Sequence, residues 1–119
     1  MLIKPSSYSP GKFFKNGHLQ TIYPNLFRKI SVSFLRERMT LSDGDFIDLD
    51  FQSESRDRIC LILHGLEGSS NSHYVKGLTK ALGNNLFDVA VMNFRGCSGE
   101  TNSLFRSYHS GATEDLEEV

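Results

Sequence analysis

The stretch His64-Gly-Leu-Glu-Gly68 combines residue types and spacing that can stabilise a developing negative charge. It directly follows residues 59–63, a continuously apolar run that is typical of a strand buried on both faces. Gly65 would let the backbone turn beyond the strand, which would leave the amide of Leu66 free to point into a cleft. Backbone amides aimed in this way stabilise the oxyanion formed in acyl transfer. The turn therefore predicts half of an oxyanion hole, although an ordinary strand-to-helix turn explains the His-Gly dipeptide equally well.

An oxyanion hole serves a nucleophile, and the 119 residues contain no serine in the pattern Gly-x-Ser-x-Gly. The nearest match begins at Gly96, in Gly-Cys-Ser-Gly-Glu, and has glutamate where the pattern requires the last glycine. We therefore interpret Ser98 as a loop residue at the rim of the cleft. His109 and Ser110 are also interpreted as loop residues, because adjacent side chains rarely reach each other as a base and a nucleophile must.

The four histidines and two cysteines do not form a recognised metal-binding pattern. Their positions are 18, 64, 73 and 109 for histidine and 60 and 97 for cysteine, and these spacings fit no standard ligand set. We expect His64 to hydrogen-bond the turn, His73 to lie in the first turn of a helix, and Cys60 to be a small buried side chain. Cys97 leaves open a cysteine nucleophile in a glycine-rich loop. No metal and no cofactor are expected.

Composition excludes several classes of protein. Lys and Arg number 13 and Asp and Glu 14, which gives a formal net charge of -1 and no basic excess that would indicate nucleic-acid binding. The first residues lack the apolar core of a signal peptide, and no run approaches the ~18 apolar residues of a membrane span. The sequence therefore predicts a cytoplasmic protein without a transmembrane segment.

The first half of the chain predicts an arm followed by a β-hairpin. Residues 1–29 carry three prolines and five aromatic residues, which favours an irregular arm with one short helix. Residues 30–41 and 45–51 alternate apolar and polar side chains, as half-buried strands do. Gly44, in the Ser-Asp-Gly-Asp segment between them, is suited to the tight turn of a hairpin.

The second half predicts a βαβ unit. Residues 58–65 and 87–94 are apolar strands, and the apolar residues between them recur at helical spacing up to Gly83. The two strands should be parallel, because a helix connects them. Thr113 followed by acidic residues predicts a further short helix, for which no later element is present to pack against.

Four motifs give the chain a specific family resemblance. They are Asn16-Gly-His-Leu-Gln-Thr-Ile-Tyr-Pro24, Leu63-His-Gly-Leu-Glu-Gly-Ser-Ser70, Asn93-Phe-Arg-Gly-Cys-Ser-Gly-Glu100, and Ser107-Tyr-His-Ser-Gly111 with Thr113-Glu-Asp-Leu116. In this order they resemble the YheT-like branch of the α/β-hydrolase superfamily, whose members are serine hydrolases of esterase or lipase type. The similarity covers nearly the whole chain from Asn16 onward. Thr101 stands where the family would have proline, in a surface loop.

The resemblance implies a Ser-Asp-His triad, with the serine on a Gly-x-Ser-x-Gly elbow after the next strand, and none of these residues is present. We therefore expect an α/β fold that is the N-terminal part of an α/β-hydrolase: an arm (1–29) and a truncated domain (30–119) with an incomplete sheet. The backbone of Leu66 would serve the oxyanion hole. The residues expected to shape its loops are His64, Gly65, Gly68, Arg95 and Gly96.

The expected function is that of a fragment of a carboxylic-ester hydrolase, acting on an ester small molecule or lipid in the full-length family and inactive alone. The alternative is a binding module that a second chain, a complementing C-terminal half, would complete at the exposed edge of strand 87–94. Two interpretations of Arg95 also stay open. It either fixes the loops of the cleft or is a surface arginine that pairs with Glu100 or Asp115.

Overall fold

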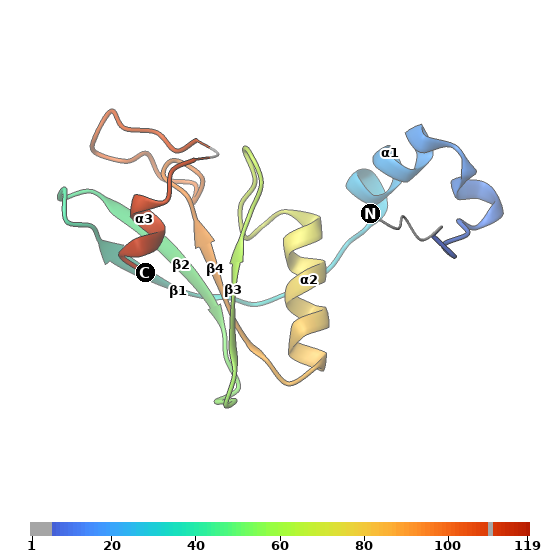
Figure 1. Ribbon diagram of the computed structural model, residues 1–119, viewed down its shortest axis with the longest axis horizontal. Helices are drawn as coiled ribbons and strands as arrows, with labels where there is room; N and C mark the ends of the chain where they lie inside the picture. Colours follow the sequence, from blue (N-terminus) through green and yellow to red (C-terminus); the bar gives the residue numbers. More distant parts are fainter. Residues whose placement is uncertain (1–5, 110) are drawn as a thin grey trace, which may run out of the picture.

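The computed structural model describes residues 6–109 and 111–119. Its core is one four-stranded mixed sheet in the order β1-β2-β4-β3, with α2 along one face and the short α3 on the opposite face (Figure 1). The elements in chain order are the 3-10 helix η1 (Lys12–Lys15), α1 (Gly17–Phe27), β1 (Leu35–Thr40), β2 (Phe46–Gln52), β3 (Ile59–Leu63), α2 (His73–Asn84), β4 (Asp88–Asn93) and α3 (Glu114–Glu117).

The predicted hairpin is confirmed, with a shorter first strand than expected. β1 and β2 are antiparallel, and Thr40 lies opposite Phe46 across a turn in which Gly44 has a φ of 84°. β1 begins at Leu35 rather than at residue 30. Residues 30–34 pair with no strand, and Ile30 instead lies close to Gly77 of α2.

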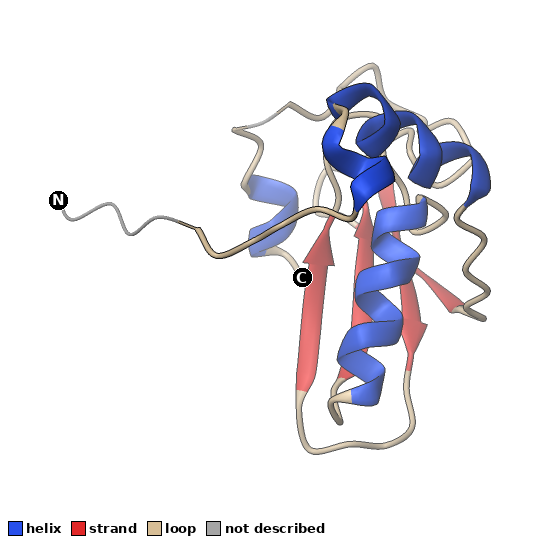
Figure 2. Cartoon of the chain, turned by 90° about the vertical axis from the view of Figure 1, so that its right-hand side faces the viewer, coloured by secondary structure: helices blue, strands red, loops and turns tan. Residues whose placement is uncertain are grey.

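The predicted βαβ unit is also confirmed. β3 and β4 are parallel, with Ile59 opposite Asp88 and Leu63 opposite Met92. α2 lies along one face of the sheet (Figure 2), where its Val75 belongs to a buried apolar cluster. The other members of that cluster are Ile62, Val89 and Val91.

The prediction that strand 87–94 presents an exposed edge is wrong. β4 pairs with β2 on one side and with β3 on the other, and all six of its residues are buried. The two edge strands of the sheet are β1 and β3. On the face away from α2, β3 exposes Ile59, Leu61 and Leu63 at 65%, 38% and 43%. Both strands have continuously apolar sequences, so composition alone does not say which of them is central.

The short helix α3 packs against the sheet, contrary to expectation. Its Leu116 lies against a buried cluster that includes Ile47, Leu49 and Met92, on the face opposite α2. Its Asp115 is buried at 2% exposure, because Arg95 pairs with it there. A helix of four residues gains too little from its own hydrogen bonds to be stable, so these tertiary contacts stabilise it.

The arm forms a small helical unit beyond α2 (Figure 1). η1 and α1 contact each other through Phe14 and Tyr23, whose ring centroids are 5.4 Å apart, and Tyr23 also contacts Phe27 at 5.1 Å. The boundary drawn at residue 29 stays a prediction. No helix within the described parts of the chain has the length and apolar character needed to cross a membrane.

Candidate functional site

The turn after β3 and the loop after β4 lie at one edge of the sheet. Because β3 and β4 are parallel and adjacent, their carboxyl ends meet there, and in open α/β sheets ligands bind at this edge. The predicted residues of both motifs, from His64 to Gly68 and at Arg95 and Gly96, are therefore brought to the same side of the sheet.

The backbone amides of the turn leave one donor without a partner. The N–H of Gly65 donates to the hydroxyl of Tyr74 at 2.9 Å, and the N–H of Glu67 donates to the hydroxyl of Tyr108. The N–H of Leu66, between them, has no hydrogen-bond acceptor among the described residues. Leu66 as a whole residue is 82% exposed.

Every other amide from residue 65 to residue 72 has an acceptor. The N–H of Gly68 donates to the carbonyl of Gly65 at 2.9 Å, and the next four donate to Ser72 Oγ, Asn93 Oδ1, Ser69 Oγ and Ser69 O. Ser72 Oγ is therefore occupied and makes no cap for α2. The turn is a network of satisfied amides around the single free N–H of Leu66.

The turn owes its shape to Glu67 and Gly68 more than to Gly65. Glu67 has a φ of 53°, a left-handed conformation that costs a residue with a side chain roughly 1–2 kcal/mol. A Cβ added at Gly68 would lie 2.6 Å from the Tyr74 hydroxyl oxygen and 3.0 Å from the Gly65 carbonyl oxygen, so only glycine fits. Gly65 has no positive φ, and an added Cβ would meet Tyr74 at an ordinary 3.6 Å.

His64 joins the ends of β3 and β4. Its Nδ1 lies 2.8 Å from the carbonyl oxygen of Gly65, and its Nε2 accepts the N–H of Phe94 at 3.2 Å. This pattern requires the neutral ring with its proton on Nδ1. Both nitrogens are engaged with the backbone, and the ring is only 5% exposed, so His64 is not available as a general base.

Tyr108 brings the distant 100–112 loop onto the turn. Its ring stacks on Phe94, with centroids 5.0 Å apart and planes 7° from parallel. Burial raises the pKa of the Tyr108 hydroxyl, and a hydrogen bond with the nearby Cys97 thiol adds to the shift, so the hydroxyl is protonated at neutral pH.

Several cavities lie on the described part of the chain, two of them with volumes of about 450 Å³, and a larger one is lined by Leu66. This cavity has a volume of about 630 Å³ and no acidic side chain, lysine or arginine in its lining. Its lining residues are Leu63, His64, Gly65, Leu66, Phe94, Tyr108, His109, Ala112, Thr113 and Leu116. The absence of charge favours an uncharged, apolar ligand group.

Arg95 is buried at 4% exposure, so the interpretation as a surface arginine is wrong. Its guanidinium makes two hydrogen bonds of 2.8 Å to Asp115, and it pairs with Asp43 at 2.7 Å and Asp45 at 3.3 Å. The hydrogen bonds to Asp115 raise the pKa of Arg95 further above its ordinary value. Of the two partners expected for a surface pair, Asp115 is correct, whereas Glu100 pairs with Arg38.

Asp45 extends this ion-pair cluster to the loop after β4. Its carboxylate accepts the side chain of Asn102 at 2.9 Å and the amides of Ser103 and Leu104 at 3.1 and 3.2 Å. Burial alone would raise the pKa of Asp45, but these hydrogen bonds outweigh it and lower the pKa to about 2. Gly96 also contributes, since its φ of 75° favours glycine and its N–H donates to Asn102.

The remaining candidates lie apart or carry structural contacts. His73 is the first residue of α2 and His18 lies in α1, while the Nδ1 of His109 accepts the N–H of Gly111 at 3.1 Å. The carbonyl of Ser98 accepts a hydrogen bond from Arg36. Ser110 falls outside the described residues. Within the described ranges, no group of three or more His, Cys, Asp or Glu side chains is placed to hold a metal ion.

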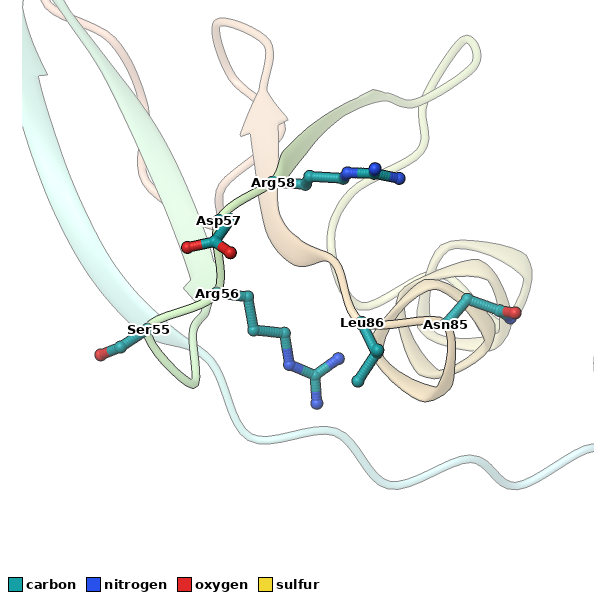
Figure 3. Close-up of a pocket in the computed structure, with 6 residues that line it drawn as sticks. All are labelled: Ser55, Arg56, Asp57, Arg58, Asn85 and Leu86. Atoms are coloured by element: carbon teal, nitrogen blue, oxygen red, sulfur yellow. The ribbon is translucent and has the colours of Figure 1, made fainter.

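A second cavity lies at the opposite end of the sheet (Figure 3). It has a volume of about 450 Å³ and lies between the loop before β3 and the loop before β4. Its residues are Ser55, Arg56, Asp57, Arg58, Asn85 and Leu86. This is the amino end of the parallel strands, away from the edge where open α/β sheets bind ligands, so the turn after β3 is the stronger candidate.

Comparison with curated proteins shows relatives that match nearly the whole chain. YheT of Escherichia coli (strain K12), whose name assigns it to the esterases, is 44% identical over 116 residues, which are 92% of this chain and 34% of YheT. The resemblance to the YheT-like branch of the α/β-hydrolase superfamily is confirmed. Human phospholipase ABHD3 is 31% identical over 95% of this chain and 30% of its own length. The embryogenesis-associated protein EMB8 of Picea glauca is 28% identical over 90% of this chain and 26% of its own length.

This YheT-like chain spans about a third of the length of the curated relatives it matches. Its mixed sheet and helices agree with the expected fold, an incomplete N-terminal part of an α/β-hydrolase. No family model and no solved structure matches the chain.

Sequence reasoning missed the two tyrosines that flank the Leu66 amide in this YheT-like chain. Tyr74 lies in the segment that helical spacing predicts as a helix, and Tyr108 belongs to the last family motif, so neither pattern indicates a role at the turn. The two tyrosines are 9 and 41 residues further along the sequence than the amides that donate hydrogen bonds to their hydroxyls. Only the positions of aromatic residues beside the two glycine-rich motifs could have indicated them.

Proposed function

We propose that this YheT-like chain supplies the oxyanion-binding turn of a serine hydrolase that cleaves carboxylic esters. The observation that carries the proposal is the N–H of Leu66, which has no acceptor among the described residues and belongs to a residue that lines a cavity of about 630 Å³ at the carboxyl edge of the sheet. An amide in this position donates to the carbonyl oxygen of an ester as that oxygen becomes negatively charged. The names of YheT and ABHD3 support ester or lipid substrates.

In the proposed reaction the residues of this chain bind and stabilise, and other residues carry out the bond exchange. The cavity would hold the apolar part of the ester against Phe94 and Leu116, while Leu66 donates to the oxyanion. The sequence has no Gly-x-Ser-x-Gly serine, and both nitrogens of His64 are engaged with the backbone. We therefore propose that the nucleophile, base and acid of a Ser-Asp-His triad come from residues outside these 119, and we expect the chain alone to be inactive.

The test uses a chimaera in which this chain replaces the matching third of YheT. Labelling with a fluorophosphonate probe and hydrolysis of p-nitrophenyl butyrate report on the nucleophile and on turnover. Leu66→Pro removes the amide proton and should lower kcat by about 10²- to 10³-fold, the usual effect of losing one oxyanion-hole donor. Leu66→Ala keeps the amide and is the matched control, since the leucine side chain is mostly exposed.

Two results would overturn the proposal. Equal rates for Leu66→Pro and Leu66→Ala in a chimaera that labels with the probe would show that the Leu66 amide does not stabilise the oxyanion. A stoichiometric fluorophosphonate adduct on the 119-residue chain alone would show that it contains its own nucleophile.

A second candidate function is a module completed by another polypeptide, and the free edge of β3 favours it. The unpaired edge groups of β3 can accept a further strand, and Ile59, Leu61 and Leu63 would be covered by the elements that follow such a strand. Co-expression of this chain with the remaining two thirds of YheT as a separate chain tests it. Co-purification with fluorophosphonate labelling would support the module, and failure of the two chains to associate would refute it.

A further inference from the structure

We propose that Tyr74 and Tyr108 are positioning residues, which hold the turn so that the Leu66 N–H points to the site of the oxyanion. This inference rests on the proposed function of the Leu66 amide. The two hydroxyls come from different parts of the fold, α2 and the 100–112 loop, and accept the N–H groups of Gly65 and Glu67 on either side of Leu66.

Backbone geometry makes the two hydrogen bonds act together. Each peptide unit is planar, so only the φ and ψ angles of Gly65 and Leu66 separate the two fixed N–H groups. Fixing the amides at both ends leaves the peptide unit between them, which carries the Leu66 N–H, little freedom to rotate. A glycine without such restraints would lose more conformational freedom when a ligand binds.

The hydrogen bond from Glu67 also supports an unfavourable backbone conformation. Glu67 has a φ of 53°, which a glutamate adopts only when surrounding contacts hold it there. Tyr108 supplies such a contact, and its own position is set by stacking on Phe94. Loss of the hydroxyl would therefore release the turn while leaving the ring in place.

The surroundings of each hydroxyl suit it to accept the hydrogen bond from the turn. The raised pKa of Tyr108 keeps its oxygen from becoming a phenolate, whose charge would oppose an oxyanion on the neighbouring amide. The hydroxyl of Tyr74 lies in the space left by Gly68, where an added Cβ would be 2.6 Å away. Gly68 and Tyr74 thus form one unit, in which the glycine makes room for the hydroxyl.

The experiment is an NMR titration of the ¹⁵N-labelled 119-residue chain with octanoate. Its carboxylate mimics the oxyanion, and its alkyl chain suits the uncharged cavity. The wild-type chain should show a saturable shift of the Leu66 amide. Tyr108→Phe and Tyr74→Phe should weaken octanoate binding about fivefold to tenfold, the loss expected for one hydrogen bond, and speed hydrogen exchange at Glu67 or Gly65, respectively.

Tyr23→Phe is the matched control, because Tyr23 packs between Phe14 and Phe27 and its hydroxyl has no hydrogen-bond partner among the described residues. It should leave octanoate binding unchanged. Gly68→Ala provides an independent variant that displaces the Tyr74 hydroxyl and keeps the tyrosine. It should weaken octanoate binding as Tyr74→Phe does.

The outcomes separate this inference from the proposed function. Octanoate binding in the three site variants that equals wild type, with the Leu66 amide still responding, would overturn the positioning role and leave the oxyanion role intact. No response of the Leu66 amide in the wild-type chain would overturn the proposed function itself. Weaker binding in the site variants with an unchanged urea midpoint would support positioning over a general loss of stability.

Discussion

Replacement of the buried Arg95 by methionine should destabilise the chain more than the same replacement of an exposed arginine. Methionine keeps an unbranched side chain and removes the charge that pairs with Asp115, Asp45 and Asp43. The side chains of Asp115 and Asp45 are 3% and 0% exposed, so water cannot replace the guanidinium. Removing one partner of a buried ion pair typically costs about 3–5 kcal/mol.

The hydrogen bonds that remain at each carboxylate indicate that the loss of unfolding free energy in Arg95→Met lies near the lower end of the range of about 3–5 kcal/mol. Asp45 keeps hydrogen bonds from Asn102, Ser103, Leu104 and Phe46 after the substitution. Among the described residues, Asp115 would keep one charged partner, the guanidinium of Arg106 at 4.0 Å. We therefore expect a loss of about 3 kcal/mol, mostly from Asp115. Domains of this kind have total stabilities of about 5–15 kcal/mol, so this loss is a large fraction.

Urea unfolding measured by circular dichroism checks the value. With a denaturant slope of about 1–3 kcal/mol per molar, a loss of 3 kcal/mol lowers the midpoint by roughly 1–3 M. Arg106→Met is the control, because its pair with Glu114 is exposed at 43% and 64% and such pairs contribute only about 0–1 kcal/mol. A loss for Arg95→Met no larger than for Arg106→Met would refute the reasoning.

Two further predictions concern the charges and the helix. The folded chain holds the pKa of Asp45 at about 2, below its ordinary 3.8, so its ionised form contributes stability above pH 4 that is lost as the pH falls towards 2. The difference in free energy of unfolding between wild type and Asp45→Asn should therefore shrink between these pH values in urea titrations, and a constant difference would contradict the assignment. Gly77→Ala should stabilise α2 by about 0.5–1 kcal/mol, because the closest neighbours of the new Cβ are the movable ends of Arg28 and Ile30. A lower melting temperature would show that the segment at Arg28 is fixed against α2.

Local patterns predicted the elements, and tertiary contacts decided their order. The hairpin and the βαβ unit follow from periodicity and turn residues, which operate over a few positions. The place of β4 next to β2 depends on Asn93, whose side chain donates to the Asp48 carbonyl and the Asp50 carboxylate and accepts the N–H of Ser70. The partners in these contacts are 23 to 45 residues apart in the sequence, so no local pattern predicts them.

The alternation of apolar and polar residues in β2 correctly predicts a strand, but it wrongly predicts that the polar face is exposed to water. Asp48 and Asp50 alternate with apolar residues, which predicts a strand with one face in water. Both aspartates are instead almost fully buried. In the register of the hairpin, Arg38 lies opposite Asp48 and Arg36 opposite Asp50, and each arginine makes two hydrogen bonds to its partner. Complementary charge on the neighbouring strand, read at this register, could have predicted a buried polar face.

The ion-pair cluster that stabilises the fold is connected to the candidate site through the loop after β4. Arg95 and Asp45 hold α3 and the loop at residues 102–104, and the chain continues from this loop to Tyr108, which accepts the N–H of Glu67 in the turn after β3. Loosening the ion-pair cluster should therefore speed exchange of the Glu67 amide before the sheet unfolds. The buried charges then have a role beyond their net contribution to stability, since an apolar replacement could pack equally well without directing the loop towards the turn.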